Sequence, residues 1–330
     1  MIAHPKIFLS FDKLLFLICN LFEERVRNVV YFGYLRNLKI EKSEDRRRRK
    51  LKVLVKSAFI PSDSIHRVLI ADEFRTLIQI QNPNILASGG FIVNSTNFQN
   101  FLIPSETMED GFFMVEKGDP LVYSKTAKLA ENLESLSTFD LISIAFQIAL
   151  GMEHLARLSY IHYNLSLKNV YITENQTIRI GEMGFAKSSV NSGYNRNVFK
   201  ALSPDSQALC APEVSENFEF SEKSDVWCFG VCLYQIFTLG KELDPEEVLK
   251  KNLEQSEYCH TEIFAFILTC LSLNPSDRPT FSQCVSFLEH HMDRYTPQIR
   301  VQIDRKLAEA RESQEELRRF LKIENEENED

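Results

Sequence analysis

One stretch of the sequence concentrates residue types that could act on phosphate. Within 161–187, His162, Asn164, Asn169 and Glu182 lie around two short strand-like pieces, and a glycine follows closely after the glutamate. One group of this kind can orient a hydroxyl nucleophile, and two oxygen ligands can hold Mg²⁺ on the phosphates of a nucleotide. The stretch therefore predicts a site for phosphoryl transfer.

The elements around this stretch can be predicted from periodicity. Apolar residues recur at intervals of three and four from 141 to 155, and Ser137 or Thr138 can cap the helix that they indicate. Strand-like pieces at 170–173 and 177–180 are separated by turn residues. Beyond residue 220 the pattern is helical again, with a cap at Ser221 and a turn at Asn274-Pro275.

The N-terminal third is richer in strand signals. The segments 29–35 and 51–55 are rich in β-branched residues and flank the basic run 46–50, which we expect in a solvated hairpin loop. An anionic lipid or phosphate site is the alternative interpretation of that run. Strands with one helix come first and helices follow, so we expect an α+β fold in two lobes.

Composition narrows the function classes. The 330 residues carry a formal net charge of −8, with 44% hydrophobic and 25% charged residues, as in ordinary globular proteins. The acidic balance argues against nucleic acid as a partner. The seven scattered cysteines form no CxxC pair, which indicates reduced thiols in a cytosolic chain.

Both ends of the chain carry apolar patterns. The segment 7–22 is mostly apolar but has Asp12 and Lys13 at its centre, so we expect a buried or docking helix, with a membrane-associated form as the alternative. Residues 303–323 predict an amphipathic helix, which we expect to pack on the main domain rather than to form a coiled coil.

Several ordered motifs resemble the protein kinase family. The stretch from His162 resembles the catalytic loop H-R-D-L-x-x-x-N followed by the metal loop D-F-G. Further matches are LCAPEV (209–214), SDVWCFGVCLYQIFTLG (224–240) and CLSLNPSDRPTF (270–281). Lys168 and Asn169 favour the tyrosine-kinase branch. The sequence of residues 141–162 is similar to that of receptor-type members, the Ryk-like ones among them.

The resemblance implies a bilobal kinase-like fold and a division of the chain. The apolar segment is 1–22, the kinase-like domain is 23–292 with an N-lobe to about 115 and a C-lobe from about 116, and the helix and acidic tail are 293–330. KVLVK resembles strand β3 of the family, so Lys56 would bind the nucleotide phosphates of ATP and Glu73 would pair with it. Asn169 and Glu182 would hold Mg²⁺.

Departures from the family's pattern bear on activity. Asn164 stands where the catalytic Asp would be, and a neutral amide cannot accept a proton from the attacking hydroxyl; losing a positioned base typically lowers the rate by about 10²–10⁴. Glu23, Arg25 and Asn28 stand where the family has glycines that admit phosphate, which predicts weakened ATP binding. Glu182 is one methylene longer than the family's Asp.

The activation segment (185–210) also departs from the pattern. Tyr163 replaces the Arg that would pair with a phosphate on the candidate phosphosite Tyr194, the one tyrosine of the segment. We therefore expect Tyr194 to be an ordinary loop residue.

The residues that hold the family's fold are kept. Glu213 and Arg278 would form a buried ion pair, and Asp225 would hydrogen-bond the backbone near His162. Gly184 keeps the glycine of the metal loop.

These observations predict an inactive or strongly impaired tyrosine-kinase-like pseudokinase that acts as a signalling scaffold or allosteric partner. Its partners would be signalling proteins, such as an active kinase or a receptor, and its location the cytoplasm. A slow tyrosine kinase using ATP and Mg²⁺ and a nucleotide-binding switch are the alternatives.

Overall fold

The structure is a computed structural model. It describes residues 20–24, 28–35, 51–58, 76–77, 79–86, 90–93, 99–104, 137–172, 177–187, 192–241, 243–250, 252–295 and 297–326. The chain divides into two compact units, which are described separately. The first includes 1–81, 86–109 and 309–330, and the second includes 82–85 and 110–308.

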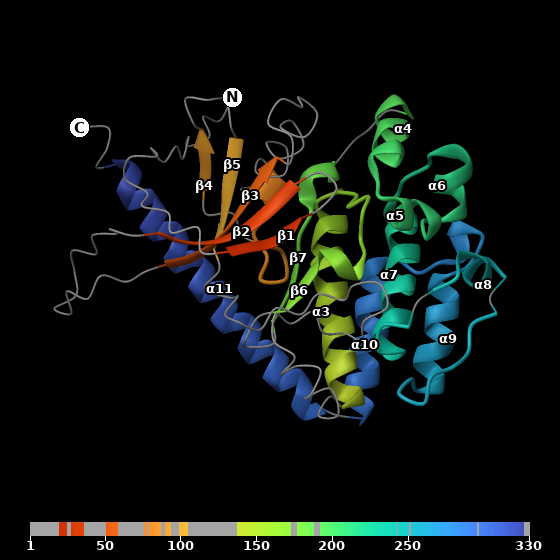
Figure 1. The fold of residues 1–330 in the computed structure, drawn as a ribbon. Helices are drawn as coiled ribbons and strands as arrows, with labels where there is room; N and C mark the ends of the chain where they lie inside the picture. The colour runs from red at the N-terminus through yellow and green to blue at the C-terminus, as the bar shows by residue number, and fades with distance from the viewer. Residues whose placement is uncertain are drawn as a thin grey trace. The chain divides into compact units, whose positions relative to one another are not determined.

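The first unit contains a five-stranded sheet in the order β1-β2-β3-β5-β4 (Figure 1). The strands are β1 (Asn20–Glu24), β2 (Asn28–Leu35), β3 (Leu51–Ala58), β4 (Gly90–Val93) and β5 (Gln99–Pro104). The predicted strands at 29–35 and 51–55 are confirmed as β2 and β3, which pair antiparallel from Asn28↔Ala58 to Leu35↔Leu51. The basic run 46–50 lies outside the described residues.

Strand β1 corrects one prediction. The end of the apolar segment 7–22 is strand rather than helix from Asn20 onward, because Asn20 and Leu21 pair with Phe32 and Tyr31 of β2. Pairing across the sheet thus overrides the local apolar pattern. The earlier part of that segment lies outside the described residues.

The second unit is mainly helical. Its helices are α3 (Thr138–Arg157), α4 (Ser192–Ala201), α5 (Pro204–Ala208), α6 (Pro212–Asn217), α7 (Glu222–Phe237), α8 (Pro245–Leu249), α9 (Thr261–Cys270), α10 (Phe281–Tyr295) and the first part of α11 (Pro297–Glu326). Short 3₁₀ turns are η3 (Leu167–Asn169), η4 (Met183–Phe185) and η5 (Pro275–Asp277). The small antiparallel sheet pairs β6 (Val170–Ile172) with β7 (Ile178–Ile180), as predicted.

The core of this unit forms where α3 packs against both α7 and α10 (Figure 1). Ser137 and Ser221 close capping boxes at the starts of α3 and α7, as their sequence positions predicted. Trp227 and Phe229 of α7 and Phe146 of α3 are buried. Removing these large apolar side chains from water drives the association of the helices.

A short segment before β4 anchors β7. Asn84 is buried, and its Nδ2 donates to the carbonyl of Ile178 at 3.0 Å, while Gln147 of α3 accepts the Ile178 N–H, also at 3.0 Å. Ile85 forms a parallel bridge with Ile180. These bonds satisfy buried polar groups and fix the strand that leads into Glu182.

The predicted C-terminal helix is confirmed and is longer than 303–323. Ile303 and Leu307 of α11 are buried, and Cζ of Arg300 lies 5.2 Å from the ring centroid of Phe146 on α3. This first part of α11 therefore packs on the helical unit, as expected.

Among the residues that the structure describes, α3 alone has the length and apolar composition to cross a membrane. Two thirds of its apolar stretch, 67%, is buried inside the protein.

Candidate active site

The loop between α3 and β6 presents the residues of the predicted site. His162 is fully buried, its Nε2 lies 3.0 Å from the carbonyl oxygen of Gly181, and its Nδ1 accepts the N–H of Asn164 at 3.2 Å. Burial lowers the pKa of His162 to about 4. The imidazole is therefore neutral, with the proton on Nε2, and it ties the loop to the segment before Glu182.

Asp225 of α7 accepts hydrogen bonds from the same loop. Its two carboxylate oxygens accept the backbone N–H groups of His162 at 2.7 Å and Tyr163 at 3.1 Å. Burial raises the pKa of Asp225 to about 7, although the two N–H bonds oppose that rise. The predicted hydrogen bond near His162 is thus present and involves two consecutive amides.

Tyr163 requires this support because of its backbone. It has a φ of 71°, in the left-handed region that non-glycine residues seldom adopt. Such a conformation costs about 1–3 kcal/mol and persists where neighbouring contacts impose it. Those contacts are the hydrogen bond from the Tyr163 N–H to Asp225 and the packing of its ring against Phe220, with 4.6 Å between the ring centroids.

Asn164 takes part in the loop through its backbone rather than through its side chain. Its carbonyl accepts the side-chain N–H of Asn169 at 2.7 Å. Its own Oδ1 is buried and has no hydrogen-bond partner within the part of the chain that the structure describes. Close by, Nζ of Lys168 pairs with Asp205 of α5 at 3.1 Å, on the surface. The position predicted to correspond to the catalytic Asp therefore carries a neutral amide whose oxygen contacts no hydrogen-bond partner among the described residues.

The segment after β7 carries the predicted metal ligand Glu182. The N–H of Gly181 donates to the backbone carbonyl of Asn169 at 2.8 Å, so the two predicted ligands lie on hydrogen-bonded segments. Glu182 has a φ of 60° and begins η4, in which Met183 is fully buried. The oxygen-bearing side chains of Asn169 and Glu182 fit the chemistry of Mg²⁺, which prefers such ligands. Gly184 lies within η4.

Tyr163 contacts the activation segment through a hydrogen bond between two uncharged side chains. Its hydroxyl donates to Oδ1 of Asn195 on α4 at 3.1 Å. The expectation that Tyr194 lies in a loop is wrong, because Ser192–Ala201 is the helix α4. Val198 of that helix is buried, and Phe199 meets Phe218 edge to face at 5.3 Å, contacts that the local sequence did not signal.

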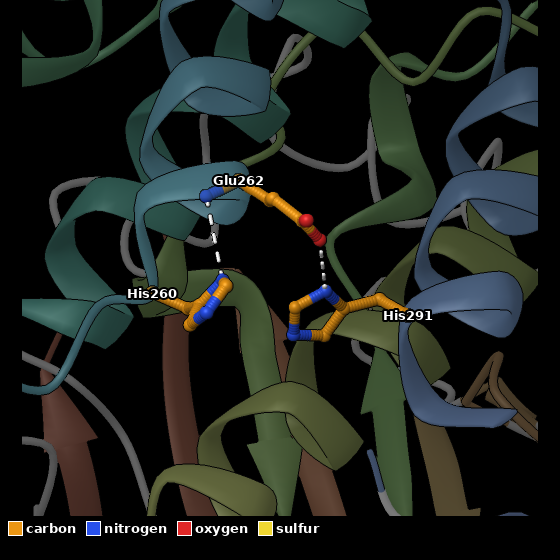
Figure 2. Close-up of side chains that lie close together, drawn as sticks. All are labelled: His260, Glu262 and His291. Atoms are coloured by element: carbon orange, nitrogen blue, oxygen red, sulfur yellow. Dashed lines mark hydrogen bonds and ion pairs between the residues drawn. The ribbon is translucent and has the colours of Figure 1, made fainter. Parts of the chain in front are cut away.

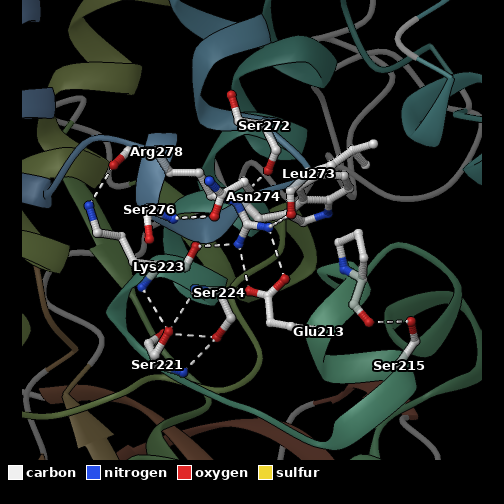
Figure 3. A network of polar contacts seen from close by, with 12 residues as sticks. Glu213, Ser215, Ser221, Lys223, Ser224, Ser272, Leu273, Asn274, Ser276 and Arg278 are labelled. Carbon is white, nitrogen blue, oxygen red and sulfur yellow. Dashed lines mark hydrogen bonds and ion pairs between the residues drawn. The ribbon is translucent and has the colours of Figure 1, made fainter.

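Glu213 and Arg278 form the predicted ion pair (Figure 3). The guanidinium donates to both carboxylate oxygens, at 2.6 and 2.8 Å, and its side chain is 0% exposed. Its remaining N–H groups donate to the carbonyls of Ser272, Lys223 and Leu273 at 2.7, 2.9 and 3.3 Å. Trp227 lies under the guanidinium, 5.0 Å from ring centroid to Cζ. These contacts fix α6, which follows the activation segment, to the start of α7 and the loop at η5.

A cavity of about 680 Å³ opens beside the loop. Its walls come from the loop itself, α5, α6, α7 and the start of α8, and include Asn164, Leu202 and Phe220. Its size is in the range of cavities that bind small molecules or single side chains of a partner.

Of the two predicted nucleotide residues, Lys56 belongs to the first unit. The backbone of Lys56 pairs with Val30 on one side and Phe101 on the other, so Lys56 lies within the sheet. Glu73 lies outside the described residues. The pairing of Lys56 with Glu73 stays a prediction.

Arg179 of β7 was not singled out from the sequence. It is 2% exposed, and none of the described residues offers a hydrogen-bond partner to its Nε or Nη2. Burial lowers the pKa of its guanidinium to about 10. No sequence pattern marks it, because a strand arginine is ordinarily exposed.

Comparison with known proteins identifies the family. The family model described as protein tyrosine and serine/threonine kinase matches residues 27–288. The chain therefore belongs to this family of protein kinases, and its fold is the α+β kinase fold that the motifs predicted.

The relatives are receptor-type tyrosine kinases of Caenorhabditis elegans. Tyrosine-protein kinase receptor ver-3 is 32% identical over 84% of this chain and 26% of its own length. Receptor-like tyrosine-protein kinase kin-15 is 32% identical over 89% of this chain and 67% of its own length. Tyrosine-protein kinase receptor old-1 is 33% identical over 89% of this chain and 61% of its own length. The chain thus spans about a quarter to two thirds of these relatives.

Proposed function

We propose that this chain is a catalytically impaired member of the tyrosine-kinase class that acts through contacts with other signalling proteins. The observation that carries the proposal is Asn164 at the position of the catalytic base. An amide has no proton-accepting oxygen of useful basicity, so the hydroxyl nucleophile would lose its general base, which is worth about 10²–10⁴ in rate.

The activation segment supports the same proposal. The contact between Tyr163 and Asn195 joins two neutral side chains, whereas binding of a phosphate requires a cation such as arginine. A phosphate added to this segment would find no guanidinium at position 163. The segment would therefore keep its conformation without the usual charge-dependent switch.

The cavity gives a partner protein a place to bind. Apolar side chains such as Leu202, Val214 and Phe220 line it, and so do the partly exposed Lys168 and Asp205. An apolar side chain of a partner segment could be buried there while its flanking polar groups meet these two charges. We infer that signalling proteins, among them an active kinase or a receptor, are the partners.

Nucleotide binding without turnover is the second candidate. It is favoured by the retention of oxygen ligands at Asn169 and Glu182, on segments joined by the Gly181 to Asn169 hydrogen bond. These residues would hold Mg²⁺, which when bound neutralises phosphate charge. ATP with Mg²⁺ would then stabilise the fold by an amount that grows with the logarithm of its concentration over Kd, about 2.7 kcal/mol at 100 times Kd.

Two measurements on the purified chain test these proposals. Phosphoryl transfer to a tyrosine peptide is compared between wild type and Asn164→Ala, and we expect no difference between them. A wild-type rate that disappears in Asn164→Ala would refute the impaired-kinase proposal and favour the slow kinase. Thermal unfolding with ATP, with and without Mg²⁺, tests for nucleotide binding, because a shift that Lys56→Met abolishes requires a working nucleotide site. The switch and the slow kinase both predict that shift and differ in turnover, whereas a scaffold that binds no nucleotide predicts no shift.

The cellular location stays a prediction. The relatives are named as receptors, which suggests membrane association for them. For this chain we propose the cytoplasm, with attachment to a membrane as the alternative.

A further inference from the structure

A cluster of metal-binding side chains lies far along the chain from the candidate active site. His260, Glu262 and His291 each offer a ligand atom, and these three atoms all lie within 4.8 Å of one another (Figure 2). His260 and Glu262 come from the start of α9, and His291 comes from α10. Two separate helices therefore bring the set together.

From this cluster we propose a binding site for a zinc-class divalent ion, held by the two imidazoles and the carboxylate. The chemistry of the set selects the ion, because imidazole nitrogens suit Zn²⁺ and its neighbours, whereas Mg²⁺ and Ca²⁺ prefer oxygen ligands alone. Three protein ligands leave a fourth position for water. His260 and Glu262 are exposed, so an ion can reach the site from solvent.

The distances in the cluster fit a tetrahedral ion. Nδ1 of His291 lies 3.3 Å from Oε2 of Glu262. With metal–ligand bonds of about 2.0–2.1 Å, two ligands of a tetrahedral ion lie about 3.3 Å apart. The imidazole rings of His260 and His291 have their centroids 5.3 Å apart, so a modest rotation of the exposed His260 completes the set.

His291 supplies an independent sign of a missing ligand. Its side chain is 4% exposed, and among the described residues its buried Nδ1 has no contact beyond the 3.3 Å approach to Oε2 of Glu262, which is not a regular hydrogen bond. Buried polar atoms are nearly always bonded, so an atom left in this state calls for an explanation. A metal ion between His291 and Glu262 would satisfy it.

Two existing contacts compete with the ion. Nη1 of Arg294 lies 3.1 Å from Oε1 of Glu262, which leaves Oε2 for the metal but adds a positive charge nearby. Nδ1 of His260 accepts the N–H of Glu262 at 3.4 Å, a long bond that caps α9. Removal of the Arg294 charge should therefore strengthen metal binding.

The test uses the full chain, stripped of metal, with Zn²⁺ and Co²⁺ as probes. Equilibrium dialysis should give one ion per chain, and Co²⁺ should show the intense visible bands of tetrahedral coordination without a thiolate charge-transfer band. His260→Ser keeps a residue that can cap α9 but removes the imidazole, and it should weaken Zn²⁺ binding by about 100-fold or more, since even indirect partners of a metal site are worth 10–100-fold.

His290→Ser is the matched control, because His290 is an exposed neighbour outside the cluster, and it should bind Zn²⁺ as wild type does. Arg294→Gln should bind more tightly than wild type. Equal affinity of His260→Ser and wild type, or the weak spectrum of octahedral Co²⁺, would overturn the proposal. Neither readout depends on phosphoryl transfer, so the result tests this proposal independently of the proposed function.

Discussion

The Glu213–Arg278 pair lends itself to a direct test of stability. In Glu213→Gln the guanidinium keeps its carbonyl acceptors but loses a carboxylate that holds it by two bonds of 2.6 and 2.8 Å. Arg278 is fully buried and Glu213 is 11% exposed, so solvent cannot replace the lost charge. Breaking such a pair typically costs about 3–5 kcal/mol, against a total stability of about 5–15 kcal/mol.

Urea denaturation followed by circular dichroism measures the free energy of unfolding of Glu213→Gln and of Glu216→Gln. Glu216 lies on the same helix α6 but is exposed, so its variant should change stability by less than about 0.5 kcal/mol. Fluorescence of Trp227, the one tryptophan, reports on the same region, since its ring contacts Arg278. A loss below about 1 kcal/mol in Glu213→Gln would refute the reasoning that this pair fixes α6 to the helical unit.

Three further predictions concern buried groups. Burial lowers the pKa of His162 from 6.5 to about 4, so the folded state excludes a proton that the unfolded chain binds. The stability advantage of wild type over His162→Gln should therefore shrink by about 3 kcal/mol as pH falls from 6.5 to 4. A difference in stability that does not change with pH would contradict this prediction. Gly230→Ala should lose about 1–3 kcal/mol despite better helix propensity, because the added Cβ would lie 2.9 Å from Cβ of Cys270; a rise in Tm would show that α9 can move aside. Arg179→Met should raise the free energy of unfolding by about 1–4 kcal/mol, because an apolar side chain replaces a buried cation with two nitrogens that lack partners among the described residues. A loss of stability in this variant would indicate that the cation has a partner.

Local signals predicted the elements of this protein well. Ser137 and Ser221 cap helices because their side chains bond the first free N–H groups, and that requirement is readable from the sequence. Asp225 and Arg278 could be assigned partners from motif positions alone. Their partners are backbone groups and one carboxylate, which the family's fold places at fixed sites.

Other features depend on contacts between distant segments and gave no sequence signal. The helix around Tyr194 forms because Val198 and Phe199 find buried or aromatic partners elsewhere in the chain. The left-handed backbone of Glu182 is a conformation that its residue type does not favour. His260 and His291 are 31 positions apart, and only the packing of α9 and α10 brings them together.

The most direct test of the central claim is to restore a carboxylate at position 164. Phosphoryl transfer from ATP and Mg²⁺ to a tyrosine peptide is measured for wild type and Asn164→Asp at equal concentration. If the missing base limits the reaction, Asn164→Asp should be faster by about 10²–10⁴, with Asn164→Ala no slower than wild type. A wild-type rate equal to or above that of Asn164→Asp would contradict the claim that this amide is what impairs catalysis.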